Sequence, residues 1–248
     1  MHILLTVAYD GTAYAGYQRQ KNGYTVQEAL ENALAALYRQ TIPTTQASRT
    51  DAGVHALGQR VGFFCDNRIP LEKLPLALNA LLPPDIAVSR AEEVPAGFHP
   101  RFDALEKTYR YQFALGRTPD PLMTRYALFV SQALDVEAMG RACEAFAGEH
   151  DFAAFCAAGG SAKTTVRTVR DCALAERTGD GLCRLLTLEI TGSGFLYNMV
   201  RIVAGTALYV GLGKIAAADL PGIIARGRRQ EAGKTLPPQG LTLLRIGY

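Results

Sequence analysis

The sequence predicts an α+β fold built from two halves, each with an antiparallel sheet and helices on one face. The order strand, helix, strand, strand, helix, strand occurs twice along the 248-residue chain, although no residue-level repeat accompanies it. The composition, 48% hydrophobic and 20% charged, suits a chain with a substantial core. It excludes disordered and collagen-like chains.

Strand and helix signals alternate through the first half. Aliphatic and β-branched residues predict a strand over residues 3–9. Thr25, with Glu28 three residues later, predicts a capping box, and apolar residues at helical spacing continue the helix to about Arg39. Three further elements complete this half: a strand over 59–65, a helix over 70–82 stopped by two prolines, and a strand over 86–91.

The second half begins with an alternating, aromatic segment over residues 108–115 that predicts a strand. Asp135 is placed to cap a helix running through Phe146, with Gly148 beyond its end. Residues 178–181 (TGDG) give a strong hairpin signal. The other expected elements are strands over 166–176, 182–190 and 241–246 and helices over 195–210 and 220–228.

A boundary near residues 102–106 divides the chain into expected halves of 1–104 and 105–248. The net charge of +3 and the pI of about 8.6 mean that any nucleic-acid binding depends on where the charges lie rather than on their total. Five widely spaced cysteines without a CxxC pair indicate reduced thiols, not a zinc site or a disulfide framework. The N-terminus has no signal-peptide pattern, and polar residues interrupt the apolar tract 195–212. We therefore expect a soluble, cytoplasmic protein.

Residues 49–55 (RTDAGVH) form the densest chemical segment, in a loop between predicted strands. Three interpretations compete. Asp51 is a simple helix N-cap, with His55 one turn later. Alternatively, Asp51 and His55 bind a metal at i, i+4 spacing, although no third ligand is close in sequence. In the third interpretation Asp51, kept ionised by the adjacent Arg49, is a catalytic carboxylate.

The segment 49–59 resembles the catalytic motif of the tRNA pseudouridine synthase A family, and the likeness extends over essentially the whole chain. The N-terminal, middle and C-terminal motifs occur in the family's order and at sensible spacing. Two residues depart from the pattern: Tyr17 stands where the family commonly has Trp, and Ser48 where Gly is usual. The matching segments are 9–11, 16–20 and 25–27, then 98–102 and 107–111, then 150–152, 167–169 and 194–201.

The resemblance implies a role for each matching residue. Asp51 is the nucleophile that detaches uracil from ribose, and Arg201 is the basic residue that pairs with it. Tyr109 packs on the target base and assists removal of the C5 proton, while Arg49 helps to hold the flipped-out nucleotide. The further substrate-binding candidates are His55, Arg101 and Arg110.

The resemblance also implies the fold and the reaction. It implies two ferredoxin-like halves whose sheets meet at a central cleft, and a homodimer that isomerises uridine at tRNA positions 38, 39 and 40. The base must leave its stack, which costs a few kcal/mol. The reaction adds no group and involves no net redox change, so no cofactor is expected. Attack of the carboxylate at C1′ and attack at C6 both remain open.

Two alternatives differ in what they predict. A non-catalytic RNA-binding module with two ferredoxin-like halves would keep its function after Asp51→Asn. A pseudouridine synthase with other RNA targets would share the same catalytic residues. In each of these interpretations, clustered cations are candidate phosphate contacts to RNA. The clusters are Arg101, Lys107, Arg110 and Arg117, then Lys163, Arg167 and Arg170, then Arg226, Arg228 and Arg229.

Overall fold

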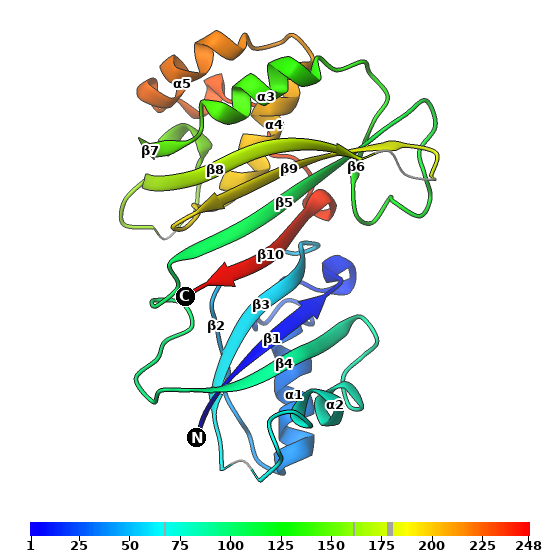
Figure 1. Cartoon of the computed structure of the whole chain (residues 1–248), viewed down its shortest axis with the longest axis vertical. Coiled ribbons are helices and arrows are strands. Elements are labelled where there is room, and N and C mark those ends of the chain that lie inside the picture. The colour runs from blue at the N-terminus through cyan, green and yellow to red at the C-terminus, as the bar shows by residue number, and fades with distance from the viewer. Residues whose placement is uncertain (67, 161, 178–180) are drawn as a thin grey trace. The chain divides into compact units, whose positions relative to one another are not determined.

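A computed structural model of the chain describes residues 1–66, 68–160, 162–177 and 181–248. It has the predicted α+β class with mostly antiparallel strand pairing. The chain divides into two compact units, Met1–Leu105 with Thr242–Tyr248, and Glu106–Leu241 (Figure 1). This division differs from the expected halves, 1–104 and 105–248, in grouping the C-terminal strand with the first unit.

The sheet of the first unit has the strand order β4-β1-β3-β10. The central strands β1 (His2–Tyr9) and β3 (His55–Phe64) pair antiparallel. On the other side of β1 lies β4 (Ile86–Val94), also antiparallel. The last strand, β10 (Leu241–Gly247), runs parallel to β3 and pairs Thr242 with His55. A short strand, β2 (Thr45–Gln46), pairs with the far end of β3.

The helices of the first unit begin and end at recognisable signals. The hydroxyl of Thr25 accepts a hydrogen bond from the Glu28 N–H, and α1 (Val26–Tyr38) starts there as predicted. It ends at Arg39, which adopts a left-handed φ of 56°. The second helix, α2 (Leu74–Asn79), is shorter than the predicted 70–82, because a turn precedes it and Lys73 provides no side-chain cap. A 3₁₀ turn, η1 (Gly11–Ala13), follows β1.

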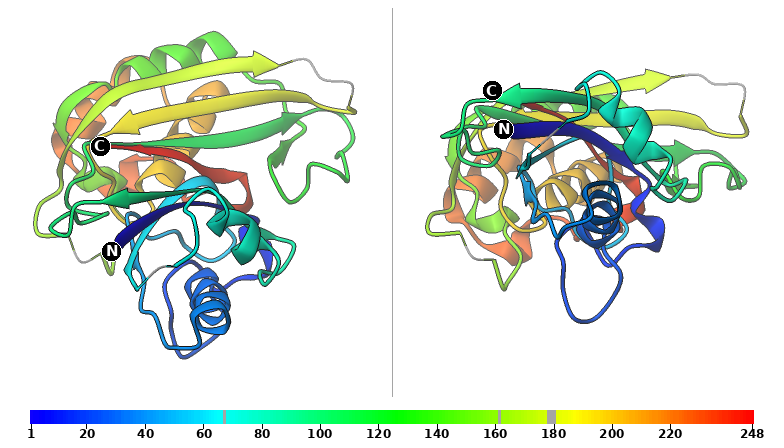
Figure 2. Two further views of the ribbon diagram at one scale, coloured as in Figure 1. Left: turned by 60° about the horizontal axis from the view of Figure 1, so that its bottom comes forward. Right: turned by 90° about the horizontal axis from the view of Figure 1, so that it is seen from below.

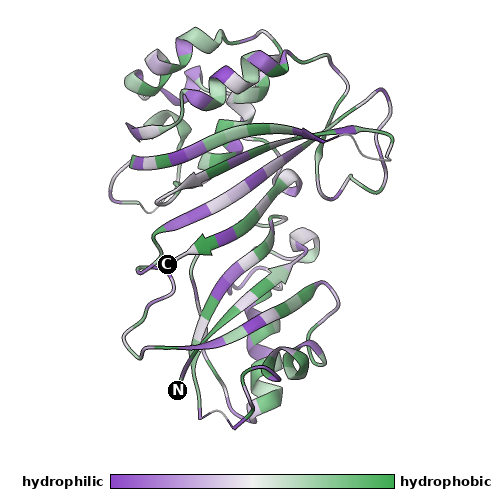
Figure 3. Cartoon of the chain, viewed as in Figure 1, coloured by the Kyte–Doolittle hydropathy of each residue, from purple (hydrophilic) through white to green (hydrophobic). Residues whose placement is uncertain are grey.

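In the second unit, β5 (Glu106–Leu115), β9 (Arg184–Gly192), β8 (Val166–Arg177) and β7 (Gly148–Asp151) form an antiparallel sheet in that order. A short parallel strand, β6 (Leu128–Val130), pairs with the end of β5. Hydrophilic and hydrophobic bands alternate along β5 and β8 (Figure 3). Such alternation is expected of strands with one buried face, because successive side chains point to opposite sides of the sheet. Of the predicted hairpin turn, residues 178–180 lie outside the described part of the chain.

Three helices, α3 (Val136–Glu144), α4 (Met199–Gly211) and α5 (Leu220–Arg226), gather on one side of β5, β9 and β8 (Figures 1 and 2). Asp135 caps α3 through the Ala138 N–H, but the helix ends before the predicted Phe146. Helix α4 begins at Met199 and not near residue 195, because Asn198 has a left-handed φ of 59°. The remaining elements are the 3₁₀ turns η2 (Ala153–Phe155), η3 (Ala217–Asp219), η4 (Arg229–Glu231) and η5 (Pro238–Gly240).

Within the described residues, no helix combines the length and the apolar character that crossing a membrane requires.

Candidate active site

Asp51 lies in the loop between β2 and β3, at the start of a tight turn. The turn closes with a 3.1 Å hydrogen bond from the Val54 N–H to the Asp51 carbonyl, and Gly53 at its apex has a φ of 77°. No helix begins at Asp51, and His55 is the first residue of a strand. The structure therefore rules out both the N-cap interpretation and the helical i, i+4 spacing on which the metal interpretation relied.

Two glycines of the N-terminal motif press against this turn. A Cβ atom on Gly11 would stand 2.0 Å from the Val54 carbonyl oxygen. On Gly16, whose φ is +95°, it would stand 2.9 Å from the Thr50 carbonyl oxygen and 3.3 Å from the Asp51 carbonyl carbon. Only a residue without a side chain permits such close approach. The two glycines thus explain why the N-terminal motif accompanies the motif around Asp51.

Asp51 itself is half-buried, whereas Arg49 is exposed. Between them Thr50 is buried and doubly bonded: its hydroxyl lies 2.7 Å from the Tyr9 hydroxyl, and its carbonyl accepts a 3.1 Å hydrogen bond from the Tyr17 N–H. The buried Thr50 thus anchors the segment, while Arg49 on one side is exposed and Asp51 on the other is half-buried. This arrangement can present a carboxylate and a guanidinium to a ligand from a fixed backbone.

His55 is only 4% exposed. Its Nδ1 lies 3.1 Å from the Gly11 N and 3.1 Å from Asp10 Oδ1. A neutral ring nitrogen accepts from the Gly11 N–H, and a protonated one donates to Asp10. Either contact ties the end of β1 to the start of β3, so these contacts give His55 a holding role beside the turn.

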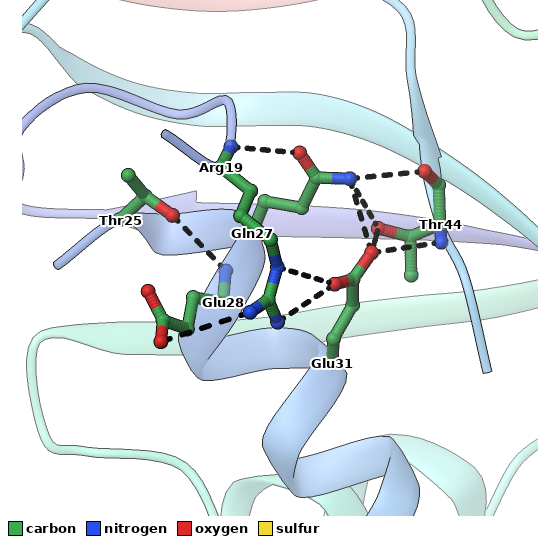
Figure 4. A network of polar contacts seen from close by, with 6 residues as sticks. All are labelled: Arg19, Thr25, Gln27, Glu28, Glu31 and Thr44. Carbon is green, nitrogen blue, oxygen red and sulfur yellow. Dashed lines mark hydrogen bonds and ion pairs between the residues drawn. The ribbon is translucent and has the colours of Figure 1, made fainter. Parts of the chain in front are cut away.

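The rest of the N-terminal motif forms a polar network centred on Glu31 (Figure 4). One carboxylate oxygen of Glu31 accepts from Gln27 Nε2 and from both the N–H and the hydroxyl of Thr44, each at 3.0 Å. The other accepts from Arg19 Nε and Nη2 at 3.1 and 3.0 Å. Charge-assisted bonds of this kind are the strong ones. Glu31 lies outside the matched motif segments, and only its i, i+4 spacing from Gln27 could have indicated it.

Tyr17, which departs from the family pattern, is completely buried beneath the loop. Its ring lies 6.0 Å from that of Tyr9. Among the described residues its hydroxyl has no partner at full hydrogen-bonding geometry. Burial raises the pKa of the phenol well above its usual value, and the Thr44 side chain opposes part of that rise. A fully buried aromatic ring therefore stands at the position where the family pattern commonly has Trp.

In the second unit, β5 carries Tyr109 and Arg110 on opposite faces. Tyr109 is 6% exposed, and its ring makes an edge-to-face contact with Phe195 at 5.3 Å. Arg110 donates to Glu189 Oε1 through Nε and Nη2, at 2.9 and 2.7 Å. The phenol of Tyr109 is thus held from one side by Phe195, and the charge of Arg110 is largely balanced within the unit.

Arg201 is the half-buried cation of α4, a helix whose other residues are almost all buried. Its Nε donates to the Leu236 carbonyl at 2.7 Å, and its Nη1 donates to Asn198 Oδ1 at 2.6 Å. It also acts on the buried Tyr111, where it partly opposes the rise in pKa that burial causes. Two fixed acceptors therefore orient the guanidinium.

The Leu236 carbonyl reaches Arg201 because the segment before it packs directly on α4. A Cβ on Gly205 would lie 1.9 Å from the Lys234 carbonyl oxygen, and one on Gly233 would lie 2.4 Å from the Gly205 backbone. The Gly233 N–H donates to the Thr206 hydroxyl at 2.9 Å. Two glycines thus bring the backbone acceptor of Arg201 into place.

Most of the predicted phosphate contacts are exposed, and several of the exposed ones also form ion pairs. Arg101 is exposed and lies over the Phe102 ring at 5.8 Å, on a turn where the backbone N–H groups of both residues donate to His99 Nδ1. Several others are engaged within the unit, which lowers their net charge toward RNA. These are Arg110 with Glu189, Arg170 with Glu106, and Arg226 and Arg228 with Glu231.

In the described part of the chain, no group of three or more His, Cys, Asp or Glu side chains is arranged to hold a metal ion.

The comparisons with known proteins agree with the motifs. The family model described as tRNA pseudouridine synthase matches residues 5–103 and 142–248. The chain belongs to the tRNA pseudouridine synthase family. The tRNA pseudouridine synthase A of Caldicellulosiruptor bescii is 46% identical over 247 residues, covering 100% of this chain and 99% of the relative. That of Citrifermentans bemidjiense is 48% identical over 248 residues, covering 100% and 97%.

Family membership makes the enzyme an isomerase and confirms the predicted fold class. The sequence-predicted site residues lie in both units. Arg49, Asp51 and His55 belong to the loop and strand of the first, as does the exposed Arg101. Tyr109, Arg110 and Arg201 lie on β5 and α4 of the second. Their individual roles in this synthase are part of the proposal that follows.

Proposed function

We propose that this chain isomerises uridine to pseudouridine in the anticodon stem-loop of tRNA, at positions 38, 39 and 40, with Asp51 as the nucleophile. The observation that carries the proposal is the turn at Asp51. Its carboxylate is half-buried, and its backbone is anchored through Thr50 and packed under Gly11 and Gly16. A carboxylate held in this way meets the positioning requirement of a nucleophile.

The reaction conserves every atom of the nucleotide. The N1–C1′ bond breaks, the base turns in the pocket, C5 bonds to C1′, and the proton lost from C5 is balanced by one gained at N1. A carboxylate promotes this by attack at C1′, or by attack at C6 of the base. Both routes need the target nucleotide flipped out of its stack, which costs a few kcal/mol and least in a loop.

Tyr109 and Arg201 complete the proposed site. Tyr109, supported by Phe195, supplies a stacking surface worth about 1–3 kcal/mol for the uracil ring, and its phenol assists removal of the C5 proton. Arg201, oriented by Asn198 and the Leu236 carbonyl, keeps Asp51 ionised.

Arg49 and Arg101, both exposed, are proposed to contact the flipped nucleotide and the phosphate backbone. His55 and Arg110 are the further substrate-binding candidates. We also propose that the enzyme is a cytoplasmic homodimer that recognises tRNA by shape. Light scattering coupled to size-exclusion chromatography measures the oligomeric state directly, and a monomer at assay concentrations would refute the dimer.

The decisive experiment incubates unmodified tRNA with the enzyme and maps pseudouridine at each position. Asp51→Asn should abolish conversion while tRNA binding, measured by gel shift, is retained. Asp66→Asn is the matched control, because that carboxylate is 86% exposed. Full conversion by Asp51→Asn would refute the nucleophile. Binding of tRNA without any conversion by the unaltered chain would favour a binding module, and pseudouridine only outside positions 38–40 would refute the target.

A further inference from the structure

A chain of buried and part-buried hydrogen bonds supports the loop that carries Asp51, and it begins at Gln59. The Gln59 side chain is 0% exposed. Its Oε1 accepts from the Ser48 N–H at 3.1 Å, and its Nε2 donates to the Ser48 carbonyl at 2.7 Å. One side-chain amide thus satisfies both backbone groups of a loop residue, as a neighbouring strand would.

The chain continues from Gln59 to the residue before Asp51. Gln59 Nε2 lies 3.4 Å from the Tyr9 hydroxyl, which lies 2.7 Å from the Thr50 hydroxyl. Both supports are built on the central strands: Gln59 pairs with Val7 across β3 and β1, and Tyr9 is the last residue of β1. Neighbouring strands therefore determine where residues 48 and 50 lie.

We propose that Gln59 and Tyr9 are positioning residues for the reaction, which set the place of the Asp51 carboxylate by fixing the backbone on its N-terminal side. This inference rests on the proposed role of Asp51. Neither residue needs to touch the substrate. An error of 1 Å in the placement of a reacting group can cost about 100-fold in rate, so the chain affects kcat more than binding.

Backbone contacts hold residues 51–54, on the C-terminal side of the loop. Side-chain support is therefore needed at residues 48–50, on the N-terminal side of Asp51. The turn bond from Val54 and the close packing of Gly11 already fix residues 51–54. In the described part of the chain, residues 48–50 belong to no strand, since β2 ends at Gln46, and one backbone bond there runs from the Tyr17 N–H to the Thr50 carbonyl. The side chains of Gln59 and Tyr9 supply that support.

The same unit offers a matched control for the amide. Asn79, at the end of α2, also binds both groups of one backbone residue: its Oδ1 accepts from the Val88 N–H at 2.8 Å, and its Nδ2 donates to the Val88 carbonyl at 2.9 Å. That contact joins α2 to β4 and involves no residue of the loop. Tyr14, which donates to Asp85 Oδ1 at 2.6 Å, is the corresponding control for Tyr9.

The experiment compares Gln59→Met with Asn79→Leu, and Tyr9→Phe with Tyr14→Phe. For each variant kcat and KM are measured on unmodified tRNA, together with tRNA affinity and the urea midpoint. We expect Gln59→Met and Asn79→Leu to lower the urea midpoint similarly. Only Gln59→Met and Tyr9→Phe should lower kcat, by about 10- to 100-fold, with tRNA affinity unchanged.

Three results would overturn the proposal: an unchanged kcat in Gln59→Met, an equal loss of kcat in Asn79→Leu, or a loss confined to tRNA affinity. If Gln59→Met does not fold, the comparison of Tyr9→Phe with Tyr14→Phe tests the proposal by itself. Both changes remove only a hydroxyl and keep the aromatic ring, so both variants should fold. Asp51→Asn is assayed in parallel. Its full activity would refute the proposed function, whereas an inactive Asp51→Asn with normal Gln59→Met and Tyr9→Phe would refute only the positioning role.

Discussion

Gly11 and Val54 touch backbone to backbone, so closely that a methyl group on Gly11 would stand 2.0 Å from the Val54 carbonyl oxygen. One residue follows the first strand and the other completes the turn of the proposed nucleophile. The contact makes the N-terminal glycine part of the support of Asp51.

Gly11→Ala should therefore impair both folding and reaction. The added carbon cannot be accommodated without moving residues 51–54, so we expect a stability loss of about 1–3 kcal/mol and a fall in kcat. Gly140→Ala is the control, since a Cβ there meets nothing within 4 Å and the site is inside α3. Alanine in a helix interior should stabilise by about 0.5–1 kcal/mol. Urea unfolding measures both, and the same sign for the two variants would contradict this account.

Removing the hydroxyl should change the free energy of unfolding differently at two equally buried tyrosines. Tyr17 and Tyr111 are both 0% exposed, but Tyr111 donates to the Pro237 carbonyl at 2.8 Å, whereas the Tyr17 hydroxyl has no partner at full hydrogen-bonding geometry among the described residues. Tyr111→Phe should cost about 1–3 kcal/mol, because the part-buried Pro237 carbonyl loses its donor. Tyr17→Phe should leave the free energy of unfolding unchanged or raise it. A large loss in Tyr17→Phe would show that the hydroxyl is hydrogen-bonded.

Glu31→Gln should destabilise the first unit although no catalytic role is assigned to it. The neutral amide keeps the shape of Glu31 but weakens the bonds from Arg19, Gln27 and Thr44 that meet on the carboxylate. We expect a loss of about 2–4 kcal/mol, measured by urea unfolding. Glu176→Gln, in the exposed pair with Arg184, should change stability by less than about 1 kcal/mol.

Arg201→Lys should lower kcat by about 10-fold or more while the fold is kept. A lysine ammonium cannot reproduce the forked geometry that reaches the Leu236 carbonyl and Asn198 together, so the cation would no longer be held by both acceptors. Arg184→Lys, at a 59% exposed side chain, is the control and should retain activity. Wild-type turnover in Arg201→Lys would show that a positive charge alone suffices.

The sequence predicted most of the elements because their signals are local. The Thr25 cap, the aromatic alternation of β5 and the Asp135 cap all depend on residues within one turn or one strand. Two of the element boundaries that were predicted wrongly, the start of α4 and the start of β3, depend on backbone conformation or strand pairing. The left-handed Asn198 delays α4, and the pairing of β10 with β3 extends β3 back to His55.

The candidate residues were identified by resemblance. Gln59, Gly11 and Gly16 lie in the same matched segments, but the resemblance did not indicate their supporting contacts. Glu31, Gln59 and the close glycine contacts depend on which segments pack together, and periodicity carries no information about that. The structure supplies them. It also shows that His55, which the resemblance implied as a substrate contact, is 4% exposed and lies against Gly11 and Asp10.

The C-terminal strand has a consequence for the order of synthesis. The strand that lies beside His55 is β10, and the whole second unit, Glu106–Leu241, precedes it along the chain. A ribosome making this protein therefore exposes the first unit with one edge of β3 still open until the second unit has been translated. The sheet of the first unit lacks its last strand, β10, until the second unit has been synthesised. The first unit therefore cannot complete its sheet during translation before the second unit emerges.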